Sequence, residues 1–150
     1  MSNTPGKYVY DYPRPAVAVD MVIVSKDTPR KVLLIRRKND PFANTWAIPG
    51  GFVDMDESLD VAARRELLEE TGVKVAKVEQ LHTFGDPDRD PRGRVISVVY
   101  LAEIDPKKVK PVAADDAADV GWYSLNRPPA LAFDHGKILS MARKRLANRS

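Results

Sequence analysis

The stretch from Leu59 to Thr71 has the period of an amphipathic helix, but carboxylates interrupt its apolar face. At about 100° per residue, Glu66 and Glu70 fall in the middle of that face, and Glu69 lies at its border. The apolar residues of the face are Leu59, Ala62, Ala63 and Leu67. Burying an unpaired carboxylate costs several kcal/mol, so this pattern requires something cationic to compensate it.

The glutamates Glu66, Glu69 and Glu70 have the spacing i, i+3, i+4, so they meet within one helical turn. Clustered carboxylates repel one another when empty and become favourable around Mg²⁺ or Mn²⁺, which also keep waters and bind substrate phosphates. The pattern therefore predicts a divalent-metal site at the edge of the core. The alternative is a solvated helix face on which Arg64 and Arg65 pair with the glutamates.

Glycines delimit this helix on both sides. Pro49-Gly50-Gly51 interrupts an extended run that begins at Trp46, which indicates a backbone that approaches another group closely. Asp54 and Asp56 are candidate helix caps, and Gly72 is the expected stop. The sequence thus predicts a loop–helix–loop that brings the Gly50 carbonyl near the glutamates.

Short β-branched runs and turn clusters organise the rest of the chain. We expect strands over 16–24, 31–36, 46–53, 73–84, 94–104 and 120–124, and a closing helix over 132–147. Two polar segments, 85–93 and 107–119, read as loops. This order, with a helix between strands and another at the end, predicts one mixed α/β or α+β domain over residues 1–150.

Composition excludes several classes of protein. The 150 residues include no Cys, which rules out disulfides, thiolate chemistry and zinc sites of the Cys type. The first 25 residues carry no signal pattern, and the apolar runs are too short for a membrane span. The net charge of +3 is spread along the chain apart from a basic cluster at its end. We therefore expect a cytoplasmic protein with neither nucleic acid nor a membrane as partner.

The spacing around the helix is highly specific. It runs Gly51, five residues, Glu57, seven residues, Arg65-Glu66-Leu67, one residue, Glu69-Glu70, one residue, Gly72-Val73. This run matches the Nudix box at every defined position, and the chain as a whole resembles a Nudix hydrolase. The resemblance implies an α/β/α sandwich with a mixed β-sheet, and the hydrolysis of a nucleoside diphosphate linked to another moiety.

The resemblance also implies roles for the residues of the box. The Gly50 carbonyl, Glu66 and Glu70 would bind Mg²⁺ or Mn²⁺, and Glu69 would be a further or water-mediated ligand. Arg65 would hold the carboxylates by salt bridges, and Glu57 would pair with Arg65 to fix the loop. The metal would neutralise the diphosphate and activate the water that attacks phosphorus.

The chain departs from the family at the position of the general base. Family members commonly place a Glu shortly before a Trp on the last strand, whereas this chain has Asp116 six residues before Trp122. Three alternatives follow from the resemblance: Asp116, Glu69, or a metal-bound water that needs no dedicated base.

Segments outside the box are similar to the Nudix subgroup that cleaves ADP-ribose to AMP and ribose 5-phosphate. In this interpretation Arg89, Arg92 and Arg94 bind a diphosphate or a ribose phosphate. An aromatic ring stacks on the adenine, and the candidates are Tyr10, Phe42 and Phe52. The alternative for the arginines is a solvated loop in which they pair with the neighbouring aspartates 86, 88 and 90.

Two other functions are alternatives to the hydrolysis of ADP-ribose. The same mechanism would serve another nucleoside diphosphate sugar, a dinucleotide polyphosphate or a modified nucleoside triphosphate. A silent ADP-ribose sensor is disfavoured because the box carboxylates are intact and we expect no winged-helix domain after the Nudix fold. We expect a homodimer by analogy, with residues 1–15 at the interface. His135 is expected to start the closing helix and make a local hydrogen bond.

Overall fold

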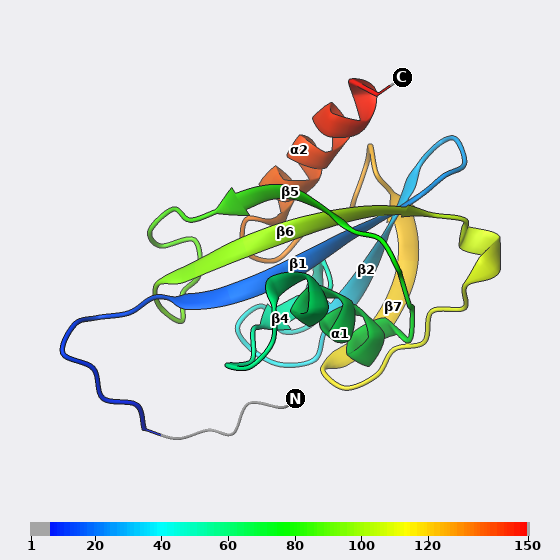
Figure 1. Ribbon diagram of the computed structural model, residues 1–150. Coiled ribbons are helices and arrows are strands. Elements are labelled where there is room, and N and C mark those ends of the chain that lie inside the picture. Colours follow the sequence, from blue (N-terminus) through cyan, green and yellow to red (C-terminus); the bar gives the residue numbers. More distant parts are fainter. Residues whose placement is uncertain (1–6, 150) are drawn as a thin grey trace.

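A computed structural model describes residues 7–149, which form one mixed β-sheet between two helices (Figure 1). The strands are β1 (Ala16–Ser25), β2 (Lys31–Arg37), β3 (Trp46–Ala47), β4 (Gly50–Phe52), β5 (Glu79–Phe84), β6 (Val95–Ile104) and β7 (Ala117–Ser124). The helices are α1 (Leu59–Thr71), α2 (His135–Ala147) and the short 3₁₀ helix η1 (Pro106–Lys108). This arrangement confirms the expected α/β/α sandwich.

The long strands β1 and β6 form the centre of the sheet. The sheet order is β3-β2-β1-β6-β5, with β4 also paired to β1 and β7 to β2. β1 and β6 run parallel from Ala16↔Val95 to Ser25↔Ile104, while the other pairs are antiparallel. Eight consecutive residues of β1 are buried because a helix covers each face of the sheet.

Alternating side chains of β1 divide the core into two layers. Val19, Met21 and Ile23 pack on the face covered by α1, together with Leu67 of that helix. Val22 and Val24 point to the opposite face, where they pack with residues of α2. Each layer buries one helix stripe against the sheet, which fixes the position of α1 and of its glutamates.

Local boundaries differ from the sequence-based expectation in several places. β7 begins at Ala117, inside the segment expected as a loop over 107–119, and the strand expected over 46–53 is divided into β3 and β4. The strand expected over 73–84 starts only at Glu79. Ser58, rather than Asp54 or Asp56, is the N-cap residue of α1, and it makes no side-chain cap hydrogen bond. The closing helix begins at His135 instead of at 132. Gly72 ends α1 at φ 73°, as expected for a left-handed C-cap.

No helix within residues 7–149 is long and apolar enough to cross a membrane. The segment before β1 carries the exposed side chains of Tyr8, Val9, Tyr10 and Tyr12. The first six residues of the expected dimer segment, 1–6, lie outside the described part of the chain.

Candidate active site

Two glycines bring β4 against both β1 and α1. A Cβ atom at Gly50 would lie 2.2 Å from the Val19 carbonyl oxygen, and one at Gly51 would lie 2.6 Å from the Glu66 carboxylate. These distances are far below a normal contact, so a side chain at either position would displace its neighbour. The glycines therefore allow the backbone to pass directly beside the glutamates of α1.

Arg65 binds three glutamates at once. Its guanidinium donates to Glu57 at 2.6 Å, to Glu66 at 2.9 Å and to Glu69 at 3.1 Å. It also donates to the Phe52 carbonyl at 3.2 Å. Hydrogen bonds from Arg65 lower the pKa of Glu57, and those to Glu57 raise the pKa of Arg65. This network ties the loop after β4 to the middle of α1.

Glu66 and Glu70 carry their carboxylates into the protein, with 5% and 6% of each residue exposed. Burial raises the pKa of both groups, and that of Glu70 rises well above its usual value. Glu66 is met by Arg65, whereas Glu70 accepts a 2.8 Å hydrogen bond from the Gly50 N–H. A cation beside Glu70 would therefore stabilise its charged form.

The donors at this site match a hard divalent cation that is only partly held by protein. Within residues 7–149, no three His, Asp or Glu side chains are arranged to hold a metal ion by themselves. Glu66 and Glu69 are hydrogen-bonded to Arg65, and Glu70 to Gly50. Because Mg²⁺ and Mn²⁺ keep waters and take phosphate oxygens, they need fewer carboxylates than an all-protein cage supplies.

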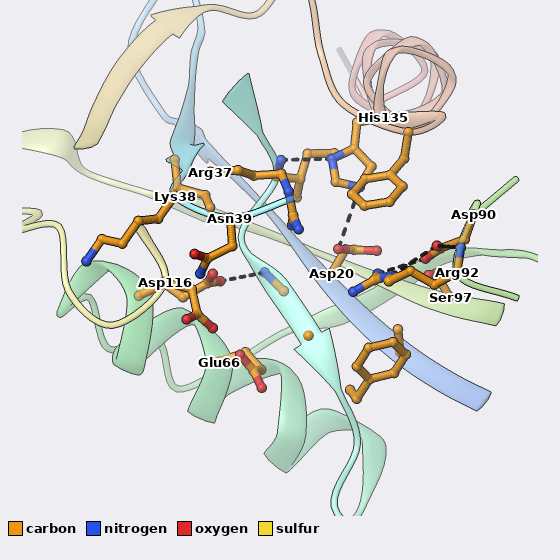
Figure 2. A pocket seen from close by; sticks show the side chains of 18 of the residues that line it. Asp20, Arg37, Lys38, Asn39, Glu66, Asp90, Arg92, Ser97, Asp116 and His135 are labelled. Atoms are coloured by element: carbon orange, nitrogen blue, oxygen red, sulfur yellow. Dashed lines mark hydrogen bonds and ion pairs between the residues drawn. The ribbon is translucent and has the colours of Figure 1, made fainter. Parts of the chain in front are cut away.

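A cavity of about 240 Å³ opens beside these glutamates (Figure 2). Glu66 and Glu70 line one side together with Gly50. Asp116, which is exposed just before β7, and Arg37 at the end of β2 also line it. The lining combines carboxylates, guanidinium groups and aromatic rings, which suits a ligand that is both charged and aromatic.

Asp20 and His135 form a buried polar pair on the far side of the cavity (Figure 2). Burial raises the pKa of Asp20 to about 7 and lowers the pKa of His135 to about 3, so the imidazole is neutral. His135 Nδ1 accepts from the Ile48 N–H at 3.0 Å, which leaves the proton on Nε2. Nε2 lies 3.9 Å from Asp20 Oδ1.

The family is settled by a match to the NUDIX domain model over residues 14–142, which is most of the chain. This protein belongs to the Nudix family. The loop and helix around Arg65 are therefore its Nudix box, and the expected sandwich is that of the family.

Two relatives of this Nudix chain carry ADP-ribose in their names. An ADP-ribose pyrophosphatase of Methanocaldococcus jannaschii is 48% identical over 129 residues, which cover 85% of this chain and 73% of the relative. The ADPR-responsive transcriptional repressor NtrR of Acinetobacter baylyi is 40% identical over 145 residues. That match covers 93% of this chain but only 58% of the repressor.

Solved Nudix structures have the same fold. The Nudix domain of Shewanella oneidensis NrtR, solved with ADP-ribose, aligns with a TM-score of 0.81 at 36% identity over 91% of this chain and 94% of that domain. A bifunctional NMN adenylyltransferase/ADP-ribose pyrophosphatase of Francisella tularensis, solved with AMP and a Mn ion, aligns with a TM-score of 0.77 at 33% identity. The alignment covers 91% of this chain and 43% of that protein.

The three arginines expected to contact substrate have different environments. Arg89 is buried and makes a bidentate ion pair with Asp134 at 2.6 and 2.8 Å, although it still lines the cavity. Arg92 pairs with Asp90 at the cavity and lies 4.8 Å from the ring centre of Phe52. Arg94 donates to the Gly85 carbonyl and does not line the cavity. The pairing of Arg92 with Asp90 agrees with the alternative that the arginines pair with aspartates of their own loop. Arg89 does not fit that alternative, because its partner Asp134 is 45 residues away.

Of the aromatic candidates, Phe52 lines the cavity, but Tyr10 does not. Tyr10 is 43% exposed and lies under the Arg14 guanidinium, 3.9 Å from its ring centre. Phe42 is not among the residues that line the cavity either, but it contacts Phe133 with ring centres 4.7 Å apart. Tyr10 therefore lies away from the site that the other residues form.

Sequence reasoning missed several residues of the cavity, among them Phe133, Arg37, Asp20 and His135. Phe133 has φ 52° and touches Phe42, and Arg37 lies 5.0 Å from the Phe133 ring centre. The sequence signal for Asp20 is that it is the one charged residue of β1. His135 starts α2 as expected, but its side chain binds the Ile48 amide, 87 residues away, instead of a local group.

Proposed function

We propose that this Nudix protein hydrolyses ADP-ribose to AMP and ribose 5-phosphate with Mg²⁺ or Mn²⁺ as cofactor. The observation that carries the proposal is the position of Glu66 and Glu70, two buried carboxylates that line a mixed polar and aromatic cavity. The 48% identity to an ADP-ribose pyrophosphatase and the NrtR domain solved with ADP-ribose support the choice of substrate.

The metal would be held by Glu66, Glu70 and the Gly50 carbonyl, with Glu69 as a further or water-mediated ligand. When bound, it supplies positive charge to the diphosphate and acidifies a water. Arg65 keeps the glutamates in place and Glu57 holds Arg65 to the loop. Both Arg65 and Glu57 are positioning residues, since they act through the carboxylates.

Asp116 is the base that we favour. It lines the cavity beside Glu66 and Glu70, whereas Glu69 is hydrogen-bonded to Arg65. An exposed carboxylate at the rim can take the proton of the attacking water and release it to solvent. Hydrolysis then forms one P–O bond to water and breaks the bridging P–O bond of the diphosphate.

The cationic and aromatic groups of the cavity supply substrate contacts in this proposal. Arg92 and Arg37 would bind the diphosphate because both line the cavity and end in guanidinium groups. Phe52 and Phe133 offer ring faces for the adenine. Arg89, already bound to Asp134, contributes through its remaining N–H groups and its charge.

A single domain, a homodimer and a cytoplasmic location belong to the same proposal. The match of the family model to residues 14–142 supports one domain. The exposed Tyr8, Val9 and Tyr12 support burial of the N-terminal segment against a second copy. Light scattering on the purified chain should then give twice the mass of 16.7 kDa.

Product analysis tests the activity. Wild type and Glu70→Gln receive ADP-ribose, NADH, GDP-mannose, UDP-glucose, diadenosine polyphosphate and 8-oxo-dGTP in parallel, with Mg²⁺. We expect preferential cleavage of ADP-ribose to AMP by wild type, and a loss of at least about a hundredfold in the variant. Preferential cleavage of another compound would overturn the proposal that ADP-ribose is the substrate.

ADP-ribose sensing is the second candidate, favoured by the 40% identity to an ADPR-responsive repressor. Calorimetry with ADP-ribose on the same two proteins separates it from catalysis. Tight binding without turnover of any compound would favour the sensor, and turnover would exclude a silent module.

A further inference from the structure

Asp20 is a charged residue in the centre of the sheet. It lies on β1 between Gly50 of β4 and Val99 of β6, and the other nine residues of the strand carry no charge. Only 7% of Asp20 is exposed, and its side chain lines the cavity. A carboxylate at such a position is costly unless donors satisfy it, so its presence indicates a ligand group that supplies them.

The neighbours of Asp20 leave part of its acceptor capacity free. Ser97 donates to it through its hydroxyl group. Arg89, the charged group that acts most strongly on Asp20, is engaged by the bidentate pair with Asp134 and by a 2.9 Å bond to the Ser97 hydroxyl. His135 Nε2 lies 3.9 Å away, beyond hydrogen-bond distance. A carboxylate accepts about four hydrogen bonds, so the side that faces the cavity can take more.

Asp20 Oδ1 and His135 Nε2, 3.9 Å apart, are close enough for one hydroxyl group lying beside them to bond both atoms. An oxygen about 2.8 Å from each atom donates to Asp20 Oδ1 and accepts from the His135 Nε2–H. The neutral, buried imidazole is fixed in this orientation by the Ile48 amide. The second carboxylate oxygen can accept from a neighbouring hydroxyl group, which makes a vicinal diol the matching ligand.

Charge decides which part of a nucleotide the pair can face. In its ionised form Asp20 would repel phosphate oxygens, so the diphosphate would lie nearer to Arg37 and Arg92, which also line the cavity. The sugar is the part of the proposed substrate that offers uncharged donors in adjacent positions. Both riboses of ADP-ribose carry such a diol.

We propose that Asp20 and His135 form a ribose-diol site that determines specificity for a sugar at this end of the cavity. This inference rests on the proposed function and adds to it the residues that read the sugar. Asp20 touches substrate through the hydroxyl groups, and Ser97 and Ile48 position the pair.

A double-mutant cycle between protein and substrate tests the site. Wild type and Asp20→Asn are assayed with ADP-ribose, with its analogue lacking the 2-hydroxyl of the terminal ribose, and with its analogue lacking the 2′-hydroxyl of the adenosine. We expect wild type to lose roughly tenfold to a hundredfold in kcat/KM on one analogue. Asp20→Asn should lose a similar factor on ADP-ribose and little further on that analogue. The analogue that couples identifies which ribose is held.

Equal fold-losses for Asp20→Asn on all three substrates would overturn the inference, as would a wild type indifferent to both hydroxyl groups. Asp86→Asn, an exposed carboxylate that does not line the cavity, is the matched control and should behave as wild type. His135→Asn is the second variant and should couple to the same hydroxyl group. Thermal unfolding of each variant separates misfolding from lost recognition, and turnover of ADP-ribose by wild type tests the proposed function separately.

Discussion

Arg65 holds together the carboxylates that the proposed chemistry needs. Its planar guanidinium makes four interactions at once, because it reaches Glu57, Glu66, Glu69 and a backbone carbonyl. The neighbouring Arg64 lies on the same helix but pairs with the half-exposed Asp60. The two arginines therefore offer a comparison between a buried and a surface ion pair.

We expect Arg65→Lys to lower the free energy of unfolding by about 2 kcal/mol and to reduce kcat at least tenfold. A lysine ammonium cannot bind three carboxylates in one plane, so some buried charge loses its partner. Denaturant unfolding and steady-state kinetics measure the two effects. Arg64→Lys should change stability by less than about 0.5 kcal/mol, and equal effects of the two substitutions would contradict this account.

His135 gives the stability a dependence on pH. Its pKa in the folded protein is about 3, against 6.5 for an ordinary histidine. Below pH 6.5 the unfolded chain takes up a proton that the folded one does not, so the histidine makes folding less favourable as the pH falls from 6.5 towards 3. The charged groups that act on it are Asp134, Arg89, Arg37 and Asp90, with Asp20 facing Nε2.

We expect wild type to lose up to about 1.4 kcal/mol per pH unit relative to His135→Asn below pH 6.5. Asn keeps an acceptor near Nδ1 but does not titrate. The comparison uses urea unfolding at pH 7.5, 6 and 5. Asp20 acts in the opposite direction because its pKa is raised, so only the difference between the two proteins is informative. Parallel profiles would exclude His135 as the cause.

At the scale of elements, β4 and α1 depend on glycines for two different reasons. Gly72 ends α1 at φ 73° with open space around a would-be Cβ, so it is needed for conformation. Gly51 has no positive φ but lies where a Cβ would strike the Glu66 carboxylate. Gly72 therefore allows α1 to end, and Gly51 leaves room for the Glu66 carboxylate at the site.

Gly72→Ala should therefore lower the free energy of unfolding by about 1 kcal/mol and leave kcat unchanged. Gly51→Ala should reduce kcat at least tenfold because it displaces Glu66. Thermal unfolding and kinetics on both variants test whether Gly72 affects stability alone and Gly51 affects catalysis. A catalytic loss in Gly72→Ala, or full activity in Gly51→Ala, would be inconsistent with it.

At the scale of the whole molecule, the sandwich buries Glu66 and Glu70 at a cost that a bound cation would offset. Burial raises the pKa of both, so the empty fold carries unfavourable charge. Binding to the folded state alone adds stability that grows with metal concentration, about 2.7 kcal/mol at a hundred times Kd.

We expect Mg²⁺ to raise the Tm of wild type by several degrees over a sample in EDTA. Glu70→Gln should unfold at a higher temperature than wild type in EDTA, since it removes a buried charge, and should respond little to Mg²⁺. Scanning calorimetry on both proteins, in EDTA and in Mg²⁺, measures these differences in Tm. The same Mg²⁺ shift in both would show that the cation binds elsewhere.

The sequence determined α1 and its glycine stop, and it put Glu66, Glu69 and Glu70 within one turn of that helix, because helical period and spacing act within one segment. It also determined the family and the succession of strands and helices along the chain, except that the run 46–53 forms two strands, β3 and β4. Contacts between distant segments needed the tertiary structure. The pairing of Arg89 with Asp134 joins residues 45 apart, and that of His135 with Ile48 joins residues 87 apart. Such contacts follow from how β1, β4 and α2 pack, which local propensity does not encode.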